Sequence, residues 1–240
     1  MLISVVFSFR NEEDVLDELI RRVVKILDTL PYDYEIIFVN DDSTDQSLDI
    51  LTSFATDNPN IKIINMSRQF GVSPCLMAGL RFSCGDIVVY MDADLQDPPE
   101  LIPQMVALYE NGADVVHTVR VQRKGESWAK MVITKIAYRI INSVSDISLI
   151  DNAGDFKLLN RRVVDEVVKF QEYQPYTRGL IPWVGFRQET LTYERSARFG
   201  GKTKFSLLKS RGPLNEFIKG ITAFSSIPLY LSLLLGAVIA

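Results

Sequence analysis

Two carboxylates separated by one residue follow a short apolar run near the middle of the chain. Asp92 and Asp94 come directly after Ile87–Met91, and Gln96 adds a neutral oxygen two positions further on. Mg²⁺ and Mn²⁺ favour oxygen ligands and often keep open positions for substrate phosphates. The three residues therefore predict a divalent-cation site and, through it, a substrate that carries phosphate.

Similar polar clusters, mainly acidic, follow three other apolar runs. The four clusters are Arg10–Glu13, Asn40–Asp45, Ser67–Gly71 and Asp92–Pro99. Polar loops are expected at a protein surface, and Asp45 alone is equally suited to capping a helix. Carboxylates that converge repel one another unless a cation neutralises them. Their convergence would therefore strengthen the case for a cation.

The elements that must position these clusters alternate in type. The predicted strands are short runs rich in β-branched residues, namely Leu2–Phe7, Glu35–Val39, Ile61–Asn65, Ile87–Met91 and Asp114–His117. Between them, apolar residues recur at helical spacing, as in Leu48–Phe54, Pro74–Phe82 and Leu101–Tyr109. This alternation predicts an α/β fold with right-handed βαβ units and a mostly parallel sheet. Ligands of such sheets bind beyond the carboxyl ends of the strands, where all four clusters would meet.

Beyond residue 120 the alternation is lost. The pattern there predicts a helix at Trp128–Val144, a strand at Asp155–Leu159, a helix at Arg162–Phe170 and a strand at Arg187–Glu194.

Composition and charge exclude several classes of protein. The 240 residues are 47% hydrophobic, which rules out a disordered chain. With two cysteines and one histidine, a disulfide scaffold, a His-ligated zinc enzyme and a Ser-His-Asp hydrolase are not expected. We expect both Cys75 and Cys84 to be buried, and His117 to be packed rather than catalytic.

Charge is unevenly distributed along the chain. Residues 1–100 hold 7 Lys and Arg against 18 Asp and Glu, whereas residues 101–240 hold 19 against 12. An acidic half suits a cation and a basic half suits an anion, although solvated faces would give the same pattern. No nucleic-acid-binding motif is present, so nucleic acid is not an expected partner.

The last segment has a different character. Gly220–Ala240 is 21 residues long without a charged side chain, enough at 1.5 Å per residue to span roughly 30 Å of hydrocarbon. A buried core helix is the alternative. Basic residues before the segment would place the preceding domain on the cytoplasmic side of a membrane. We therefore expect a catalytic domain at 1–204, a juxtamembrane amphipathic segment at 205–219 and a transmembrane helix at 220–240.

Five ordered motifs resemble the family 2 glycosyltransferases that act on polyprenyl phosphates. The motifs are Val5–Glu13, Val39–Asp45, Asp92–Glu100, Asn152–Arg161 and Arg198–Ser206. The group includes bactoprenol glucosyltransferases, dolichol-phosphate mannose synthases and the undecaprenyl-phosphate aminoarabinose transferase. The resemblance implies the A-type nucleotide-sugar-binding glycosyltransferase fold, with a Rossmann-like, mostly parallel sheet.

On the donor side, the resemblance assigns a role to each matching position. Asp92, Asp94 and Gln96 fall on the positions that hold Mg²⁺ or Mn²⁺ and the diphosphate. The nucleotide-side positions are Ser8, Arg10, Glu12, Asp41, Arg68 and Asp92. The family usually has Pro and Tyr at positions 8 and 10 and Gly at position 42, so Ser8, Arg10 and Asp42 are departures from it.

On the acceptor side, the implied positions are basic. Arg120 falls on a position that binds the acceptor phosphate, and Lys130 lies near a second one. Arg198, Thr203 and Lys204 match a segment that closes over the diphosphate. Asp155 and Asp94 fall on positions with catalytic roles. The acceptor phosphate is already anionic, so for Asp155 we leave three roles open, namely general base, orientation of Lys157 or Arg161, and stabilisation of an oxocarbenium-like centre.

The leading hypothesis is an inverting, metal-dependent transferase of the cell envelope. It would move glucose or an N-acetylhexosamine from a UDP-sugar, rather than a GDP-sugar, to undecaprenyl phosphate or another polyprenyl phosphate at the inner membrane. One alternative is sugar transfer to a polysaccharide or another hydroxyl acceptor, and the other is a non-catalytic, membrane-tethered nucleotide-binding protein. Family members often form homo-oligomers, commonly tetramers, and often carry two transmembrane helices. The resemblance therefore implies an oligomer and an incomplete membrane region in this chain.

Overall fold

The computed structural model describes residues 1–121, 150, 153–172, 175–194 and 212–239. The chain divides into two compact units. The first contains Met1–Arg123, Asn152–Pro175 and Val184–Lys202, and the second contains Lys124–Asp151, Tyr176–Trp183 and Thr203–Ala240. The predicted helix at Trp128–Val144 lies outside the described residues.

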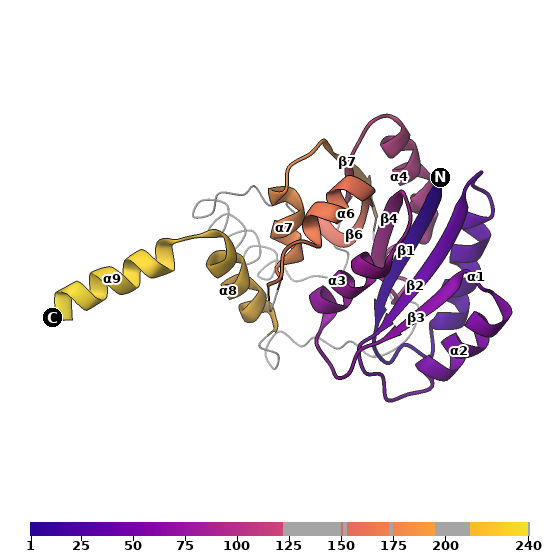
Figure 1. The fold of residues 1–240 in the computed structure, drawn as a ribbon, viewed down its shortest axis with the longest axis horizontal. Coiled ribbons are helices and arrows are strands. Elements are labelled where there is room, and N and C mark those ends of the chain that lie inside the picture. The colour runs from indigo at the N-terminus through magenta and orange to yellow at the C-terminus, as the bar shows by residue number, and fades with distance from the viewer. Residues whose placement is uncertain (122–149, 151–152, 173–174, 195–211, 240) are drawn as a thin grey trace. The chain divides into compact units, whose positions relative to one another are not determined.

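The first unit is built on a sheet in which the described residues form seven strands (Figure 1). The strand order is β3-β2-β1-β4-β6-β5-β7. The strands are β1 (Leu2–Phe9), β2 (Asp33–Asn40), β3 (Ile61–Asn65), β4 (Ile87–Asp92), β5 (Val115–Arg120), β6 (Ala153–Asn160) and β7 (Gln188–Tyr193). Only β6 among them runs opposite to its neighbours β4 and β5. The predicted mostly parallel sheet is therefore confirmed.

Helices cover both faces of this sheet. In chain order they are α1 (Leu16–Leu27), α2 (Ser47–Asp57), α3 (Val72–Phe82), the 3-10 turn η1 (Pro99–Leu101), α4 (Ile102–Glu110) and α6 (Arg161–Val167). Helix α1 buries Leu16, Leu19, Val23 and Leu27, which recur at helical spacing along one face. These side chains share a core with Ile3, Val5 and Phe7 of β1 and with α4.

Helix α3 packs on the other face of the sheet, because successive side chains of a strand point to opposite sides. A Cβ on Gly79 of α3 would lie 2.3 Å from Cγ1 of Val6 in β1, so the absence of a side chain there permits the close approach. The two helical layers fix the position of β1 and, with it, the place where the first polar cluster begins.

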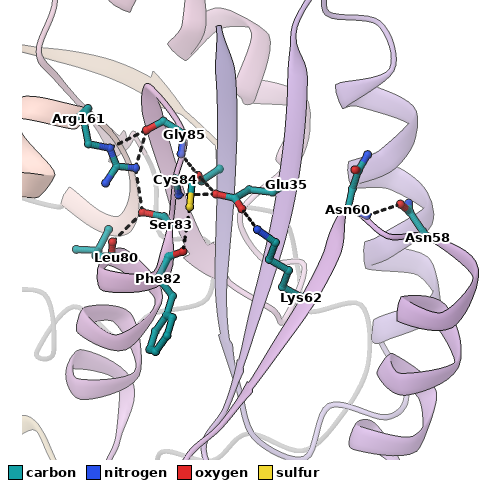
Figure 2. Close-up of polar contacts among 11 residues, drawn as sticks. Glu35, Asn58, Asn60, Lys62, Leu80, Phe82, Ser83, Cys84, Gly85 and Arg161 are labelled. Atoms are coloured by element: carbon teal, nitrogen blue, oxygen red, sulfur yellow. Dashed lines mark hydrogen bonds and ion pairs between the residues drawn. The ribbon is translucent and has the colours of Figure 1, made fainter.

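A polar network fixes the strands at the amino end of the sheet, opposite the predicted site (Figure 2). Glu35 of β2 is 4% exposed and accepts hydrogen bonds from Lys62 Nζ at 2.5 Å, Ser4 Oγ at 2.5 Å and the Cys84 amide at 2.6 Å. Burial raises the pKa of Glu35, but these hydrogen bonds outweigh it and lower the pKa below its usual value. The carboxylate therefore joins β1, β2, β3 and the turn before β4.

The two cysteines differ in exposure. Cys75 of α3 is buried, as predicted, whereas Cys84 is exposed, so the prediction that both are buried is wrong for Cys84. The cause is the network at Glu35, in which the backbone amide of Cys84, rather than its side chain, contacts the buried Glu35 carboxylate.

The second unit contains α7 (Thr177–Trp183), α8 (Gly212–Phe224) and α9 (Ile227–Ile239). The uncharged stretch from Gly220 onward forms two helices rather than the single one expected. A helix that continued from α8 would need an amide hydrogen at position 228, which proline lacks, and Pro228 instead lies in the first turn of α9. Among the described residues, no one helix has both the length and the apolar character to cross a membrane, whereas Ile218–Phe224 and Ile227–Ala237 meet that criterion as a pair bent by 86°.

Candidate active site

The carboxyl ends of the first four strands lie side by side. Ser8 of β1 stands opposite Val39 of β2 on one side and opposite Asp92 of β4 on the other, and Asn40 stands opposite Asn65 of β3. The loops that follow these strands are the four polar clusters predicted from the sequence. The fold therefore brings the clusters to one place, which we call the carboxyl end of the sheet.

The loops after β1 and β2 are joined by reciprocal hydrogen bonds. The Asn11 side chain accepts from the Thr44 amide at 2.8 Å and donates to Thr44 Oγ1 at 3.3 Å. The amide of Glu12, a buried residue, is paired with Ser47 Oγ at 2.9 Å. Arg10, half-buried, contacts the Asp42 carbonyl through Nε at 3.4 Å. The proposed nucleotide-side residues Arg10 and Glu12 thus lie in a connected pair of loops.

Asp41 holds the third loop in place. Its carboxylate is buried and accepts from the Phe70 amide at 2.6 Å and from the Gly71 amide at 3.0 Å. Burial, together with the nearby Asp41 carboxylate, raises the pKa of the Cys75 thiol to about 12. Asp41 therefore has a structural role that sequence reasoning did not assign to it.

Arg68 and Ser8 are differently placed. The Arg68 guanidinium carbon lies 3.9 Å from the centroid of the Phe70 ring, on an exposed part of the third loop. Ser8 is half-buried within β1. Ser8 lies near the carboxyl end of β1 and Arg68 lies in the loop after β3, so both are at the carboxyl end of the sheet, as predicted.

Asp92–Asp97, which we call the acidic loop, carries the proposed metal ligands. Asp92, Asp94 and Gln96 are half-buried, and Asp94 Oδ1 accepts from the Gln96 amide at 3.1 Å. Between them, Leu95 is buried with a φ of 54°, in the left-handed region that is uncommon for residues with a side chain. The buried leucine side chain holds the loop in this conformation.

Backbone strain is concentrated at this end of the sheet. Asn11, Asp42 and Leu95 have φ values of 53°, 60° and 54°, and they lie in the loops after β1, β2 and β4. Strained backbone persists only where surrounding contacts impose it, and it is common at functional sites. Asp42 stands where the resembling family usually has Gly, and its positive φ explains why glycine suits that position.

The side chains present fit a hard divalent cation. Asp92 and Asp94 offer carboxylate oxygens and Gln96 an amide oxygen, the donor types that Mg²⁺ and Mn²⁺ favour. Among the described residues, no group of three or more His, Cys, Asp or Glu side chains could hold a metal ion by itself. A cation at these residues would therefore leave positions open for other oxygen ligands, such as a diphosphate.

Arg120, the last residue of β5, lies at the same end of the sheet. Its Nε donates to Tyr193 Oη at 3.1 Å and its Nη2 to Asp97 Oδ2 at 3.3 Å. Tyr193 in turn donates to Asp97 Oδ1. Burial lowers the pKa of Arg120, but Asp97, Tyr193 and Asp155 together outweigh this effect and the pKa is raised. Sequence reasoning missed Asp97 and Tyr193, because only the fold brings them together.

Asp155 reaches the carboxyl end of the sheet because β6 runs in the opposite direction to its neighbours. It is half-buried near the start of the strand. Two residues further on, Lys157 is buried and its Nζ donates to the Gly154 carbonyl at 2.5 Å. Arg161 lies at the other end of β6, where it binds the Gly85 carbonyl. The idea that Asp155 orients Arg161 is therefore wrong, since the length of a strand separates them.

His117 of β5 is a packed residue, as expected. Burial and then the nearby Lys157 cation lower the pKa of His117 to about 4. Its Nε2 is 2.8 Å from Gln188 Oε1. The imidazole is therefore neutral at physiological pH.

Four predicted site residues lie outside the described residues. They are Lys130, Arg198, Thr203 and Lys204. Their roles stay predictions.

The chain matches known proteins over most of its length. The family model described as "Glycosyl transferase family 2" matches residues 4–168. An uncharacterized glycosyltransferase of Bacillus subtilis, YkcC, is 41% identical over 229 residues, covering 95% of this chain and 70% of that protein. A prophage bactoprenol glucosyl transferase homolog of Escherichia coli is 33% identical over 240 residues, covering 100% of this chain and 78% of that protein.

Solved structures share the fold at low sequence identity. Mannosyl-3-phosphoglycerate synthase from Rubrobacter xylanophilus has a TM-score of 0.63 and 16% identity, over 93% of this chain and 73% of that one. Glucosyl-3-phosphoglycerate synthase from Mycobacterium tuberculosis, in complex with Mn²⁺, UDP-glucose and phosphoglyceric acid, has a TM-score of 0.53 and 20% identity, over 83% and 73%. Some other solved chains are matched over little more than half of their length.

Proposed function

Because the chain belongs to glycosyl transferase family 2, we propose that it transfers a sugar from a UDP-sugar to the phosphate of a polyprenyl lipid. Its first unit has the A-type glycosyltransferase fold. The observation that carries the proposal is the convergence of two chemistries at the carboxyl end of one sheet. Half-buried carboxylates suited to a cation and a donor diphosphate lie there with an arginine suited to a second phosphate.

The names of relatives support the choice of substrates. The Escherichia coli relative is described as a bactoprenol glucosyl transferase homolog, which points to a polyprenyl acceptor. The Mycobacterium tuberculosis structure holds UDP-glucose and Mn²⁺ on the same fold. We therefore propose glucose or an N-acetylhexosamine as the sugar and UDP as the leaving group, for modification of cell-envelope glycans.

On the donor side, Asp92, Asp94 and Gln96 would hold Mg²⁺ or Mn²⁺. When bound, this cation supplies positive charge that stabilises the departing diphosphate. The loops that carry Glu12 and Asp41 would hold the nucleotide. Their mutual hydrogen bonds keep these loops in fixed positions before the substrate arrives, so less ordering is needed on binding.

On the acceptor side, Arg120 would hold the lipid phosphate. A phosphate oxygen forms a bond to the anomeric carbon while the bond from that carbon to the diphosphate oxygen breaks, and the electron pair leaves with UDP. Attack opposite the leaving group inverts the configuration. The acceptor oxygen is already anionic, so no proton has to be removed, and Asp155 is better suited to stabilising positive charge that develops on the sugar.

The second unit supports a membrane location. Leu229, Leu233 and Ile239 of α9 are 73%, 72% and 84% exposed, and such side chains favour lipid over water. We propose that α8 and α9 attach the enzyme to the inner membrane, with the catalytic unit on the cytoplasmic side, and that the enzyme is a homo-oligomer.

The test is sugar transfer by the full chain in detergent or lipid. Radiolabelled UDP-glucose, UDP-N-acetylglucosamine and GDP-mannose are each supplied with undecaprenyl phosphate and Mn²⁺ or Mg²⁺. We expect label in the organic phase from one UDP-sugar. Asp94→Asn should lower the rate by roughly 10²–10³-fold, the typical loss on removing one group that stabilises transition-state charge. EDTA should abolish transfer, and Asp57→Asn, on the exposed end of α2, should leave it unchanged.

Other outcomes would redirect the assignment. Release of UDP without label in the lipid would favour a hydroxyl acceptor. Donor binding without turnover or metal dependence would favour a non-catalytic nucleotide-binding protein.

A further inference from the structure

Three residues from separate parts of the chain surround the guanidinium of Arg120. Asp97 Oδ2 accepts from Nη2 at 3.3 Å and Tyr193 Oη accepts from Nε at 3.1 Å. A Cβ added to Gly154 would lie 3.0 Å from Nη2 and 3.4 Å from both Cζ and Nε, so the guanidinium lies against the backbone of Gly154. We call Asp97, Gly154 and Tyr193 the Arg120 clamp.

The Asp97 and Tyr193 side chains of the clamp are buried, and they are hydrogen-bonded to each other as well as to Arg120. Asp97 is 1% exposed and Tyr193 is 6% exposed. Burial, followed by the Asp97 carboxylate, raises the pKa of Tyr193 to about 12, so the phenol keeps its proton and donates to Asp97 Oδ1. Each clamp oxygen therefore has a defined role, with Tyr193 accepting from the arginine and donating to the carboxylate.

The clamp occupies one side of the guanidinium fork. The hydrogen bonds to Asp97 and Tyr193 use Nη2 and Nε, and Nη1 makes no hydrogen bond within the described part of the chain. An arginine held in this way offers its remaining donors in a fixed direction, which favours binding of a tetrahedral anion. A flexible arginine would lose side-chain entropy on binding that a clamped one has already lost.

We propose that Asp97, Tyr193 and Gly154 are positioning residues that aim Arg120 at the phosphate of the acceptor lipid. This inference rests on the proposed function, since it assigns the clamped arginine to the lipid phosphate rather than to the donor. The clamp also connects the two substrate sides, because Asp97 follows Gln96 directly in the acidic loop while Arg120 and Tyr193 stand opposite each other at the ends of β5 and β7.

The backbone behind the clamp is itself held. Lys157 Nζ donates to the Gly154 carbonyl at 2.5 Å, and the register between β5 and β6 shifts between His117 and Val119. Such irregularities re-aim side chains near active sites. Gly154 lies beside this shift in register, because the preceding residue Ala153 pairs with Val119.

The test uses variants that keep Arg120 and its charge. Gly154→Ala pushes on the guanidinium, Tyr193→Phe removes one hydrogen-bond partner, and Asp97→Asn removes the carboxylate charge. Gly154 does not have a left-handed backbone, so alanine there is free of that strain. For each variant, kcat and KM for undecaprenyl phosphate are measured with saturating donor, and the Kd of the UDP-sugar is measured by calorimetry.

We expect KM for the lipid phosphate to rise by roughly tenfold for Gly154→Ala and Tyr193→Phe, the scale of one charge-assisted hydrogen bond. The UDP-sugar Kd should stay within about twofold of the wild type, a limit well below one hydrogen bond. Matched controls lie at the amino end of the sheet. Tyr34→Phe removes a hydroxyl that binds Asp28, and Asp114→Asn removes a carboxylate that binds Arg162. Neither control should change KM for the lipid.

The proposed positioning role of the clamp is contradicted if Gly154→Ala and Tyr193→Phe have the wild-type KM for the lipid. It is also contradicted if these variants weaken UDP-sugar binding as much as lipid binding. Failure of the proposed function looks different, because the wild type itself then forms no lipid-linked sugar. A variant that merely misfolds is recognised by a lower melting temperature and loss of UDP-sugar binding, and such a result at all three positions also counts against a positioning role.

Discussion

Single residues at the carboxyl end of the sheet combine opposite charges in fixed positions. Asp92 and Asp94 suit a cation, whereas Arg120 suits an anion. The buried Asp97 follows the two carboxylates in the sequence and accepts a hydrogen bond from Arg120. Catalysis by electrostatic stabilisation requires such groups to be oriented before the reaction. The hydrogen bonds that Asp41 accepts from the Phe70 and Gly71 amides, and that Asp97 accepts from Arg120, provide that orientation.

A residue at the other end of the sheet should control stability at low pH. The pKa of Glu35 is lowered in the folded protein, so its contribution is present above the unfolded pKa and is lost as pH falls through the folded pKa. Glu35→Gln should lower the free energy of unfolding by about 1–3 kcal/mol at pH 7, because buried hydrogen bonds to a carboxylate are lost. The difference from the wild type should shrink in acid below the usual glutamate range.

Urea unfolding at a series of pH values checks this prediction. Glu189→Gln is the matched control, because Glu189 forms an exposed pair with Arg187. A Glu35 variant that loses as little stability as the Glu189 variant would contradict the role assigned to the buried network.

At the scale of elements, the direction of β6 decides which residues reach the site. Because β6 runs opposite to β4 and β5, its second and third residues, Gly154 and Asp155, lie where the other strands end. Its last residue lies at the amino end, where Asn160 begins α6. The same strand therefore contributes to the site at one end and to the structural network at the other.

The start of α6 depends on one side chain. Asn160 Oδ1 accepts from the Val163 amide at 2.9 Å, which satisfies a free amide of the first helical turn, and its Nδ2 donates to Asp114. Asn160→Ala should lower the free energy of unfolding by about 1–2 kcal/mol. Asn160→Ser keeps a capping oxygen and should recover roughly half of that loss. Chemical denaturation of the three proteins checks the order, and equal stability of the Ala and Ser variants would exclude capping as the cause.

At the scale of the whole molecule, the two units have different surfaces. The first unit buries its apolar side chains between the sheet and its helices, whereas α9 exposes large aliphatic side chains. The proposal that the second unit contacts lipid rests on this difference.

Membrane association should therefore depend on α9. Leu229 and Leu233 are four residues apart on this helix, and replacing both with Asp puts two charges on one exposed stripe. Charged side chains are costly in hydrocarbon, at about 2.5–3.5 kcal/mol each at the centre of a helix. We expect the double variant to leave the lipid fraction in a vesicle flotation assay. Phe82→Asp, an exposed position on α3, is the control and should float with the wild type.

The sequence by itself determined the alternating elements of the first half and the place of the site. The β-branched runs and the polar residues directly after them are local signals. Because parallel strands end at the same edge of a sheet, Asp92, Asp94 and Asp41 could be assigned to one end of it. Five ordered motifs were enough to indicate the family.

Only the tertiary structure decided what depends on distant contacts. The clamp joins positions 97, 120, 154 and 193, and no local pattern relates them. The exposure of Cys84 followed from a hydrogen bond to Glu35, 49 positions away. The break between α8 and α9, by contrast, has a local cause. Hydropathy averaged over a window does not detect it, because a single proline removes the hydrogen bond that a continuous helix needs at that position.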